Sequence, residues 1–188
     1  MVFTDLAVTD RALNMISPSL MRYSHLDPRS LTLNRLLAQN VASGNTMLLN
    51  RALLELALPI PPEAVMHDHW ITLTAAAFGK IVFLDEATLY YRQHGDNFSG
   101  AFHYSLYPLL RKLRMGRGKL RKGFDRNILQ AAAFGRRYAA GLNLEDEKML
   151  AALANWPSLG FFARRKLLIR YGIFKSGFLR NVGMFFFA

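Results

Sequence analysis

The sequence predicts an α/β fold for about its first hundred residues, followed by a segment that is entirely helical. The first observation is that β-prone runs occur only before Gly100, where they alternate with stretches of helical spacing. The second is the charge: residues 1–100 hold seven Lys/Arg against nine Asp/Glu, whereas residues 101–188 hold seventeen against four. A mildly acidic segment is therefore joined to a strongly basic one, and we expect different partners for the two.

The first segment contains short strands and helices in alternation. A β-prone run at residues 2–4 opens the sequence, and residues 47–49 fit either a strand or the start of a helix. Apolar residues recur at helical spacing in residues 31–39, 51–58 and 66–78. Pro59 and Gly79 end the second and third of these helices. Two strands are predicted next, at residues 80–85 and 88–92, with a tight acidic turn between them.

The second segment contains only helical patterns. They cover residues 104–114, 126–140, 144–154 and 158–171. Asn143 and Ser158 are residue types that cap helix starts, and acidic residues follow Asn143 in the first turn. The glycine-punctuated basic run at 111–122 lies near the change of pattern. We therefore predict two domains, residues 1–103 and residues 104–188.

The composition excludes several classes of protein. With 188 residues, of which 52% are hydrophobic and 12% aromatic, the chain can bury a real core, so disorder of the whole chain is excluded. The absence of cysteine excludes disulfides, thiolate metal sites and a cysteine nucleophile. Asp5 and Asp10 stand where a signal peptide needs a basic start, so we expect no secretion signal. Charged residues interrupt every apolar window, so we expect no membrane-spanning helix.

Three polar clusters interrupt apolar surroundings at the boundaries of predicted elements, where functional groups are often displayed. They comprise residues 44–46, 67–70 and 92–97. Asp68 falls in the first turn of an alanine-rich helix, where the helix dipole favours a carboxylate that can accept a proton. The alternative is that Asp68 only supplies favourable charge to the start of the helix.

The histidines suggest a metal site, but their spacing argues against one at residues 67–69. His67 and His69 are two residues apart and point in different directions on a helix, and no third ligand has suitable spacing. Arg92, His94 and Asn97 directly follow a predicted strand and could contact a diphosphate or a divalent cation. The alternative for this third cluster is a polar turn closed by a glycine.

Five motifs, taken together and in order, resemble a known family. They are Thr-Asp after the first strand, Gly-Asn-Thr-Met-Leu from Gly44, Met-His-Asp-His-Trp from Met66, Gly-Lys-Ile-Val-Phe-Leu-Asp-Glu from Gly79, and Tyr-Arg-Gln-His-Gly-Asp-Asn from Tyr91. This set is similar to the family 2 glycosyltransferases, specifically the bacterial rhamnosyltransferase-like branch that builds cell-surface polysaccharide. The resemblance covers residues 1 to about 101, and the helical remainder is similar to that branch's carboxyl-terminal extension.

The resemblance implies a partial GT-A-type (Rossmann-like) domain, namely its acceptor-side half. The amino-terminal half of the family fold binds the nucleotide-diphosphate sugar and a divalent cation, Mg²⁺ or Mn²⁺, and its strands and acidic metal motif are absent from this sequence. The resemblance further implies that Asp68 is the catalytic base. It would take the proton of an acceptor hydroxyl that attacks the anomeric carbon opposite the leaving diphosphate, with inversion of configuration.

The other motif residues take their roles from the same resemblance. His94 matches a position near the metal or the diphosphate, and Arg92 and Asn97 flank it. Residues Gly44, Asn45 and Thr46 match a loop beneath the donor sugar and the acceptor. His67 and Trp70 are placed with the substrate-binding residues, although Trp70 has an alternative role as a core residue.

The basic second segment carries a separate prediction. Its Lys and Arg residues are interleaved with Leu, Phe and Tyr, which is typical of an interfacial helix on anionic lipid. We expect a lipid-linked or glycan acceptor to be met there, at the cytoplasmic face of the cell membrane, and we do not expect a nucleic-acid partner. Two alternatives could explain the positive charge of this segment: a nucleic-acid interface or a solvated charged face. For the whole chain, the alternative to a glycosyltransferase is a noncatalytic basic binding module.

Overall fold

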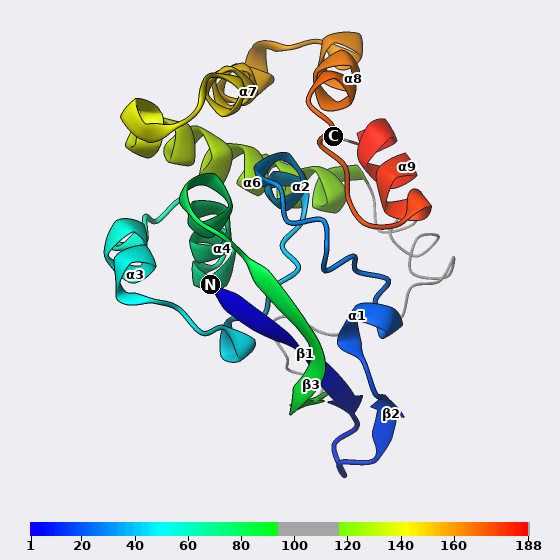
Figure 1. Ribbon diagram of the computed structural model, residues 1–188. Coiled ribbons are helices and arrows are strands. Elements are labelled where there is room, and N and C mark those ends of the chain that lie inside the picture. Colours follow the sequence, from blue (N-terminus) through cyan, green and yellow to red (C-terminus); the bar gives the residue numbers. More distant parts are fainter. Residues whose placement is uncertain (94–116, 188) are drawn as a thin grey trace.

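The structure, a computed structural model, describes residues 1–93 and 117–187 and is mixed α/β (Figure 1). The described residues form one small open sheet with strand order β2-β1-β3, which comprises Met15–Ser17, Val2–Thr9 and Val82–Arg92. Central strand β1 pairs antiparallel with β2 and parallel with β3. The α/β prediction is confirmed at this level.

The pairing of β1 with β3 corrects one sequence prediction. Instead of two strands around a tight turn, residues Val82–Arg92 form one continuous strand. The register passes from Thr4 opposite Leu84 to Asp5 opposite Ala87, so the acidic pair at 85–86 is accommodated as an irregularity within the strand. Because β1 pairs with β3 along its whole length, it extends to Thr9, well beyond the predicted run at 2–4.

Helices account for most of the remaining chain. They are α1 (Leu20–Tyr23), α2 (Leu33–Ala38), α3 (Arg51–Ala57), α4 (His67–Phe78), α6 (Arg117–Tyr138), α7 (Leu144–Ala154), α8 (Phe161–Arg170) and α9 (Phe178–Phe187). Short 3₁₀ turns lie at Gly44–Thr46, Ala139–Gly141 and Trp156–Ser158. The helices predicted at 31–39, 51–58, 66–78 and 144–154 are confirmed to within two residues at each end.

Two helix predictions at the carboxyl-terminal end have different outcomes. The Asn143 cap is confirmed, because its side chain accepts a 2.9 Å hydrogen bond from the backbone N–H of Asp146. The start near Ser158 is wrong: that residue ends a separate 3₁₀ turn, and α8 begins after an extended Gly160. The predicted helix at 104–114 lies outside the described residues.

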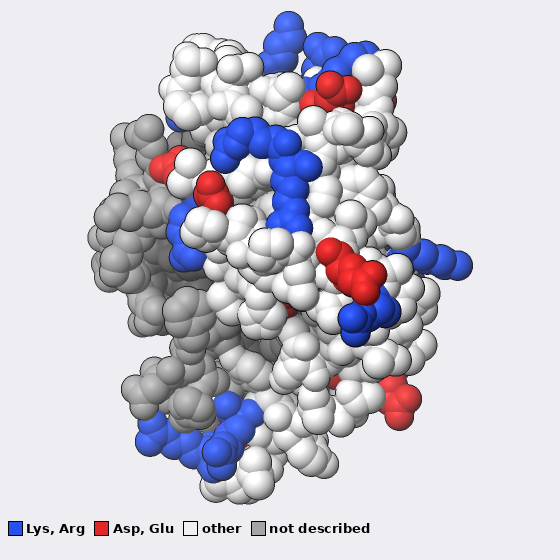
Figure 2. All heavy atoms as spheres, turned by 90° about the vertical axis from the view of Figure 1, so that its left-hand side faces the viewer, with Lys and Arg blue, Asp and Glu red and all other residues white. Residues whose placement is uncertain are grey.

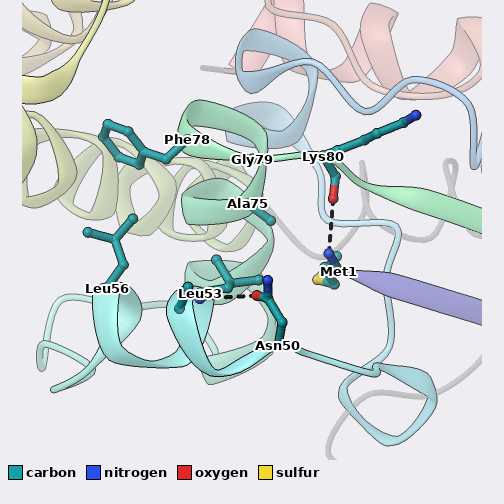
Figure 3. Close-up of a pocket in the computed structure, with 9 residues that line it drawn as sticks. Met1, Asn50, Leu53, Leu56, Ala75, Phe78, Gly79 and Lys80 are labelled. Carbon is teal, nitrogen blue, oxygen red and sulfur yellow. Dashed lines mark hydrogen bonds between the residues drawn. The ribbon is translucent and has the colours of Figure 1, made fainter.

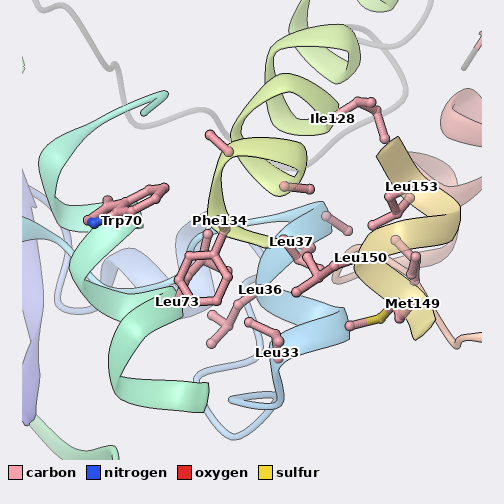
Figure 4. Close-up of a cluster of buried hydrophobic side chains, with 14 of the residues drawn as sticks. Leu33, Leu36, Leu37, Trp70, Leu73, Ile128, Phe134, Met149, Leu150 and Leu153 are labelled. Carbon is pink, nitrogen blue, oxygen red and sulfur yellow. The ribbon is translucent and has the colours of Figure 1, made fainter. Parts of the chain in front are cut away.

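The main core lies where α2, α4, α6 and α7 meet (Figure 4). Trp70 and Leu73 of α4 approach Phe134 of α6, while Leu36 of α2 and Leu150 of α7 complete the cluster. Helix α6 thus packs directly on elements from the first hundred residues. The two segments share this core, and a division into domains at 103/104 stays a prediction.

None of the helices in the described ranges is long and apolar enough to cross a lipid bilayer.

Candidate functional site

An open pocket of about 460 Å³ lies beside the amino terminus of α4. Tyr91, near the carboxyl end of β3, forms part of its wall. The pocket is therefore near the carboxyl ends of the parallel strands, the edge of an α/β sheet at which ligands commonly bind. Its polar lining includes Asn40, Ser43, Asn45, Asp68, Tyr91 and Asn127. Amide, hydroxyl and carboxylate groups of this kind can hydrogen-bond a polyhydroxylated ligand.

Asp68 is the only acidic residue among the described residues that line this pocket. It lies in the first turn of α4 and is half-buried, and the preceding Met66 supplies no capping side chain. Its Oδ2 accepts a hydrogen bond of 3.2 Å from the backbone N–H of Gly44. The carboxylate is thus anchored through one oxygen to a neighbouring loop while it borders the pocket.

Gly44 approaches the start of α4 very closely. A Cβ atom on this residue would lie 2.8 Å from Nε2 of His67 and 3.2 Å from Cβ of Asp68. Real Cβ atoms essentially never show a contact as short as the first. The loop at Gly44 and the first turn of α4 were predicted as two separate clusters, and the structure brings them together.

His67 and His69 have different environments, as their spacing predicted. His67 is exposed beside Gly44, whereas His69 is buried. A ring nitrogen of His69, Nε2, lies 2.7 Å from the carbonyl oxygen of Leu36, and the other, Nδ1, lies 3.2 Å from the Gln130 amide nitrogen. Because the carbonyl can only accept, Nε2 carries the proton and Nδ1 accepts from Gln130. Burial lowers the pKa of His69, only partly opposed by its hydrogen bond to Leu36 and the charge of Asp68.

Helix α6 contributes residues to this region that the sequence did not indicate. Asn127 lines the pocket and donates a 3.1 Å hydrogen bond to the carbonyl of Ala38. Gln130 is buried, and its carbonyl oxygen accepts from the backbone N–H of Val65 at 2.8 Å. The position of Asn127 follows from the docking of α6 on α2, which brings residues 89 positions apart into contact. The position of Gln130 follows from the docking of α6 on α4, where it meets His69, 61 positions away.

No match to this chain is found among protein-family models, curated proteins or solved structures.

Trp70 lies in the core and not at the pocket. Its side chain is fully buried, and the indole N–H donates a 3.1 Å hydrogen bond to the carbonyl of Ala57. The ring meets Phe134 edge-on at 5.3 Å between centroids and packs near Tyr138 at 6.0 Å. Of the two roles considered for Trp70, these contacts favour packing, since no face of the ring is open to a sugar.

The remaining predicted site residues are only partly brought together. Asn45 lines the pocket, and Thr46 donates a 2.9 Å hydrogen bond to the carbonyl of Ser43, which holds the 3₁₀ turn. Arg92 is exposed at the end of β3, where it is paired in register with Thr9. His94 and Asn97 lie outside the described residues.

The described residues do not form a complete binding site for a divalent cation. Within residues 1–93 and 117–187, no three His, Asp or Glu side chains gather closely enough to hold a metal ion. Asp68 borders the pocket without a second carboxylate beside it. Among the described residues, this pocket therefore offers a cation a single carboxylate, that of Asp68.

A second, smaller pocket of about 170 Å³ lies between α3, α4 and Met1, the residue that precedes β1 (Figure 3). Leu53, Leu56 and Phe78 give it an apolar wall, and the amino group of Met1 donates a 3.0 Å hydrogen bond to the carbonyl of Lys80. None of the predicted site residues lines it. Its lining, within the described residues, carries no carboxylate or histidine.

Proposed function

We propose that this chain is the acceptor-side half of an inverting, nucleotide-sugar-dependent glycosyltransferase with a GT-A-type fold, and that Asp68 is its catalytic base. One observation carries the proposal most directly. Asp68 borders an open, polar pocket near the carboxyl ends of two parallel strands and is anchored there by the N–H of Gly44. The five-motif resemblance to family 2 enzymes supports the same assignment independently of the geometry.

The proposed reaction requires one proton acceptor from this chain. An acceptor hydroxyl attacks the anomeric carbon of the donor sugar, and a new carbon–oxygen bond forms while the bond from that carbon to the diphosphate oxygen breaks. The hydroxyl proton passes to the Asp68 carboxylate, and the nucleoside diphosphate leaves with the bonding electron pair. Since attack and departure occur on opposite faces of the carbon, the configuration is inverted.

The lining of the pocket supports a sugar as the acceptor. Asn45 offers an amide that can donate and accept hydrogen bonds. Asn40 and Asn127 are bonded to the backbone of Ala42 and Ala38, but each amide has capacity for a further donor and a further acceptor bond, which suits the paired character of sugar hydroxyls. From the resemblance, the donor is a nucleotide-diphosphate sugar, with rhamnose as the transferred sugar, and the acceptor is a glycan or a lipid-linked glycan of a bacterial cell surface. Such an acceptor places the reaction at the cytoplasmic face of the membrane.

Donor binding is assigned to a further half of the enzyme. When bound there, Mg²⁺ or Mn²⁺ would neutralise the diphosphate. Strand β3 occupies an outer position in the described sheet and exposes large apolar side chains, namely Val82, Leu84, Leu89 and Tyr90. An exposed strand of this length and composition is a surface on which additional sheet elements can pack, which supports the proposal of a completing half.

The decisive assay combines this chain with a donor-binding half and measures sugar transfer. Uridine, guanosine and thymidine diphosphate sugars are offered with glycan and lipid-linked acceptors, and the anomeric configuration of the product is read by NMR. The proposal predicts transfer with inversion. Retention of configuration would contradict the proposal. If no donor supports transfer although the chain still binds anionic vesicles or nucleic acid, the noncatalytic binding module is favoured.

A further inference from the structure

Helix α8 presents an amphipathic face to solvent. Phe162 and Ile169 expose 84% and 60% of their surfaces, and Lys166 and Arg170 are exposed beside them. Along the helix these four residues are spaced by four, three and one positions, so they lie on one side of it. The opposite side, with Leu167 and Leu168, is buried in the core.

Helix α9 adds an apolar stripe with no charge in it. Phe178 and Phe186 expose 77% and 68% of their surfaces, and the half-buried Val182 lies between them. Their spacing of four residues places all three on one face over two helical turns. Met184 points the other way into the core.

The two helices are fixed to each other by Arg165. Its Nε donates a 2.7 Å hydrogen bond to the carbonyl of Phe185 in α9, and its Nη1 donates a 3.2 Å bond to the carbonyl of Phe161 in α8. The rings of Phe174 and Phe185 stack nearly parallel, with centroids 6.1 Å apart. The exposed aromatic residues of both helices therefore belong to one firmly packed unit.

Charge in this part of the chain has a single sign. Residues 149–188 contain six Lys/Arg residues and no Asp or Glu: Arg164, Arg165, Lys166, Arg170, Lys175 and Arg180. Figure 2 shows a contrasting face, on the side of α3 and away from α9, where basic and acidic side chains form small separate groups among uncharged atoms.

We propose that α8 and α9 form a membrane-docking surface for a bilayer that contains anionic lipid. Phe162, Phe178 and Phe186 insert into the boundary between head groups and acyl chains. The stems of Lys166 and Arg170 lie along the apolar layer while their charged ends contact the head-group phosphates. The positive charge of the segment draws it to the anionic surface.

The contacts of the cations favour a bilayer over a nucleic acid. Nucleic acids are bound by several cations that each neutralise a phosphate. Here Arg165 is buried between the helices, Arg164 lies over the Trp156 ring at 5.2 Å, and Arg180 donates to backbone carbonyls of residues 24, 25 and 176. The exposed cations of α8, Lys166 and Arg170, lie beside the exposed ring of Phe162. This combination of charged and aromatic side chains suits a lipid surface.

This inference extends the membrane location in the proposed function, but its test does not involve catalysis at Asp68. The full chain is sedimented with vesicles of phosphatidylcholine and with vesicles of equal parts phosphatidylcholine and phosphatidylglycerol. We expect binding to the anionic vesicles, weaker binding at high salt, and little binding to phosphatidylcholine alone. If the wild-type chain does not bind anionic vesicles although its transfer activity is intact, this inference alone is overturned.

Two variants and a matched control identify the surface. Phe162→Ser combined with Phe178→Ser removes exposed aromatic residues, and we expect at least about tenfold weaker binding. Lys166→Glu combined with Arg170→Glu should weaken binding to anionic vesicles similarly. Leu48→Ser combined with Leu144→Ser removes exposed apolar residues elsewhere and should change nothing. Circular dichroism and thermal melting confirm that each variant is folded.

Three results would overturn the proposal. The first is vesicle binding that is equal in the phenylalanine variant and the control. The second is no vesicle binding by the wild-type chain together with tight binding to duplex DNA or RNA in fluorescence anisotropy. The third is self-association that the phenylalanine variant abolishes, measured by analytical ultracentrifugation, with no vesicle binding.

Discussion

The backbone N–H of Gly44 donates a 3.2 Å hydrogen bond to Oδ2 of Asp68, across twenty-four residues of sequence. This bond joins the loop between α2 and α3 to the first turn of α4. It fixes one carboxylate oxygen at the border of the polar pocket. The geometry therefore depends on a residue small enough to let the two backbones approach.

Gly44→Ala should impair the site more than the fold. The added Cβ would meet the His67 ring at 2.8 Å and Cβ of Asp68 at 3.2 Å, so the first turn of α4 must shift. The ring of the exposed His67 can move, and we expect the free energy of unfolding to fall by no more than about 1 kcal/mol. Acceptor binding, measured by calorimetry, should weaken clearly.

A matched control for that substitution is Gly123→Ala in helix α6. A Cβ at this position meets nothing within 4 Å, and alanine is the better helix former, so stability should rise by about 0.5–1 kcal/mol with unchanged acceptor binding. Gly44→Ala combined with His67→Ala should recover part of the lost binding. Full acceptor affinity in Gly44→Ala alone would refute the close-approach argument.

Trp70→Phe tests whether the tryptophan is a packing residue. The substitution leaves the Ala57 carbonyl without its indole partner and leaves space against Phe134, so we expect a loss of about 1–3 kcal/mol of stability. The KM for acceptor should not change, because the ring has no exposed face. Urea denaturation and acceptor titration measure the two effects, with the exposed Tyr90→Phe as control. A raised KM with unchanged stability would restore the sugar-stacking role.

The buried His69 predicts a pH dependence of stability. Burial lowers its pKa from the ordinary 6.5, so the unfolded chain takes up a proton at a higher pH than the folded chain does. The stabilisation is fully present above about pH 6.5 and is lost as the pH falls below it, by at most about 1.4 kcal/mol per pH unit. Urea denaturation between about pH 8 and about pH 5 should show this slope.

His69→Gln should remove that slope, because glutamine does not titrate, whereas His67→Gln should keep it, because His67 is exposed. An identical pH dependence in wild type and His69→Gln would show that another group is responsible.

The fold could be predicted where it depends on local pattern. Helical periodicity located α2, α3, α4 and α7, and Asn143 was identified as a cap because its hydrogen bond lies within three residues. The continuity of β3 could not be predicted, since Asp85 and Glu86 have the composition of a turn. Only pairing with β1, about eighty residues away, carries the strand through them.

In the candidate site, too, local sequence identified single residues but not the contacts that depend on tertiary packing. Asp68 and the loop at Gly44 were both indicated by their local chemistry, but their contact depends on the packing of α2 and α4. Asn127 and Gln130 gave no signal, because an amide on a helix is ordinarily solvated. Asp5 belongs to one of the five motifs, yet the structure uses it to bind the start of α1: its carboxylate accepts from the backbone N–H groups of residues 20 and 21.

The most direct test of the account is the turnover of Asp68→Asn, measured with the donor-binding half present. Asparagine can still accept the Gly44 hydrogen bond but cannot take a proton, so we expect turnover to fall at least about a hundredfold. Binding of the nucleotide-sugar and the melting temperature should stay at their wild-type values. Wild-type turnover in this variant would remove Asp68 from the chemistry and contradict the proposed mechanism.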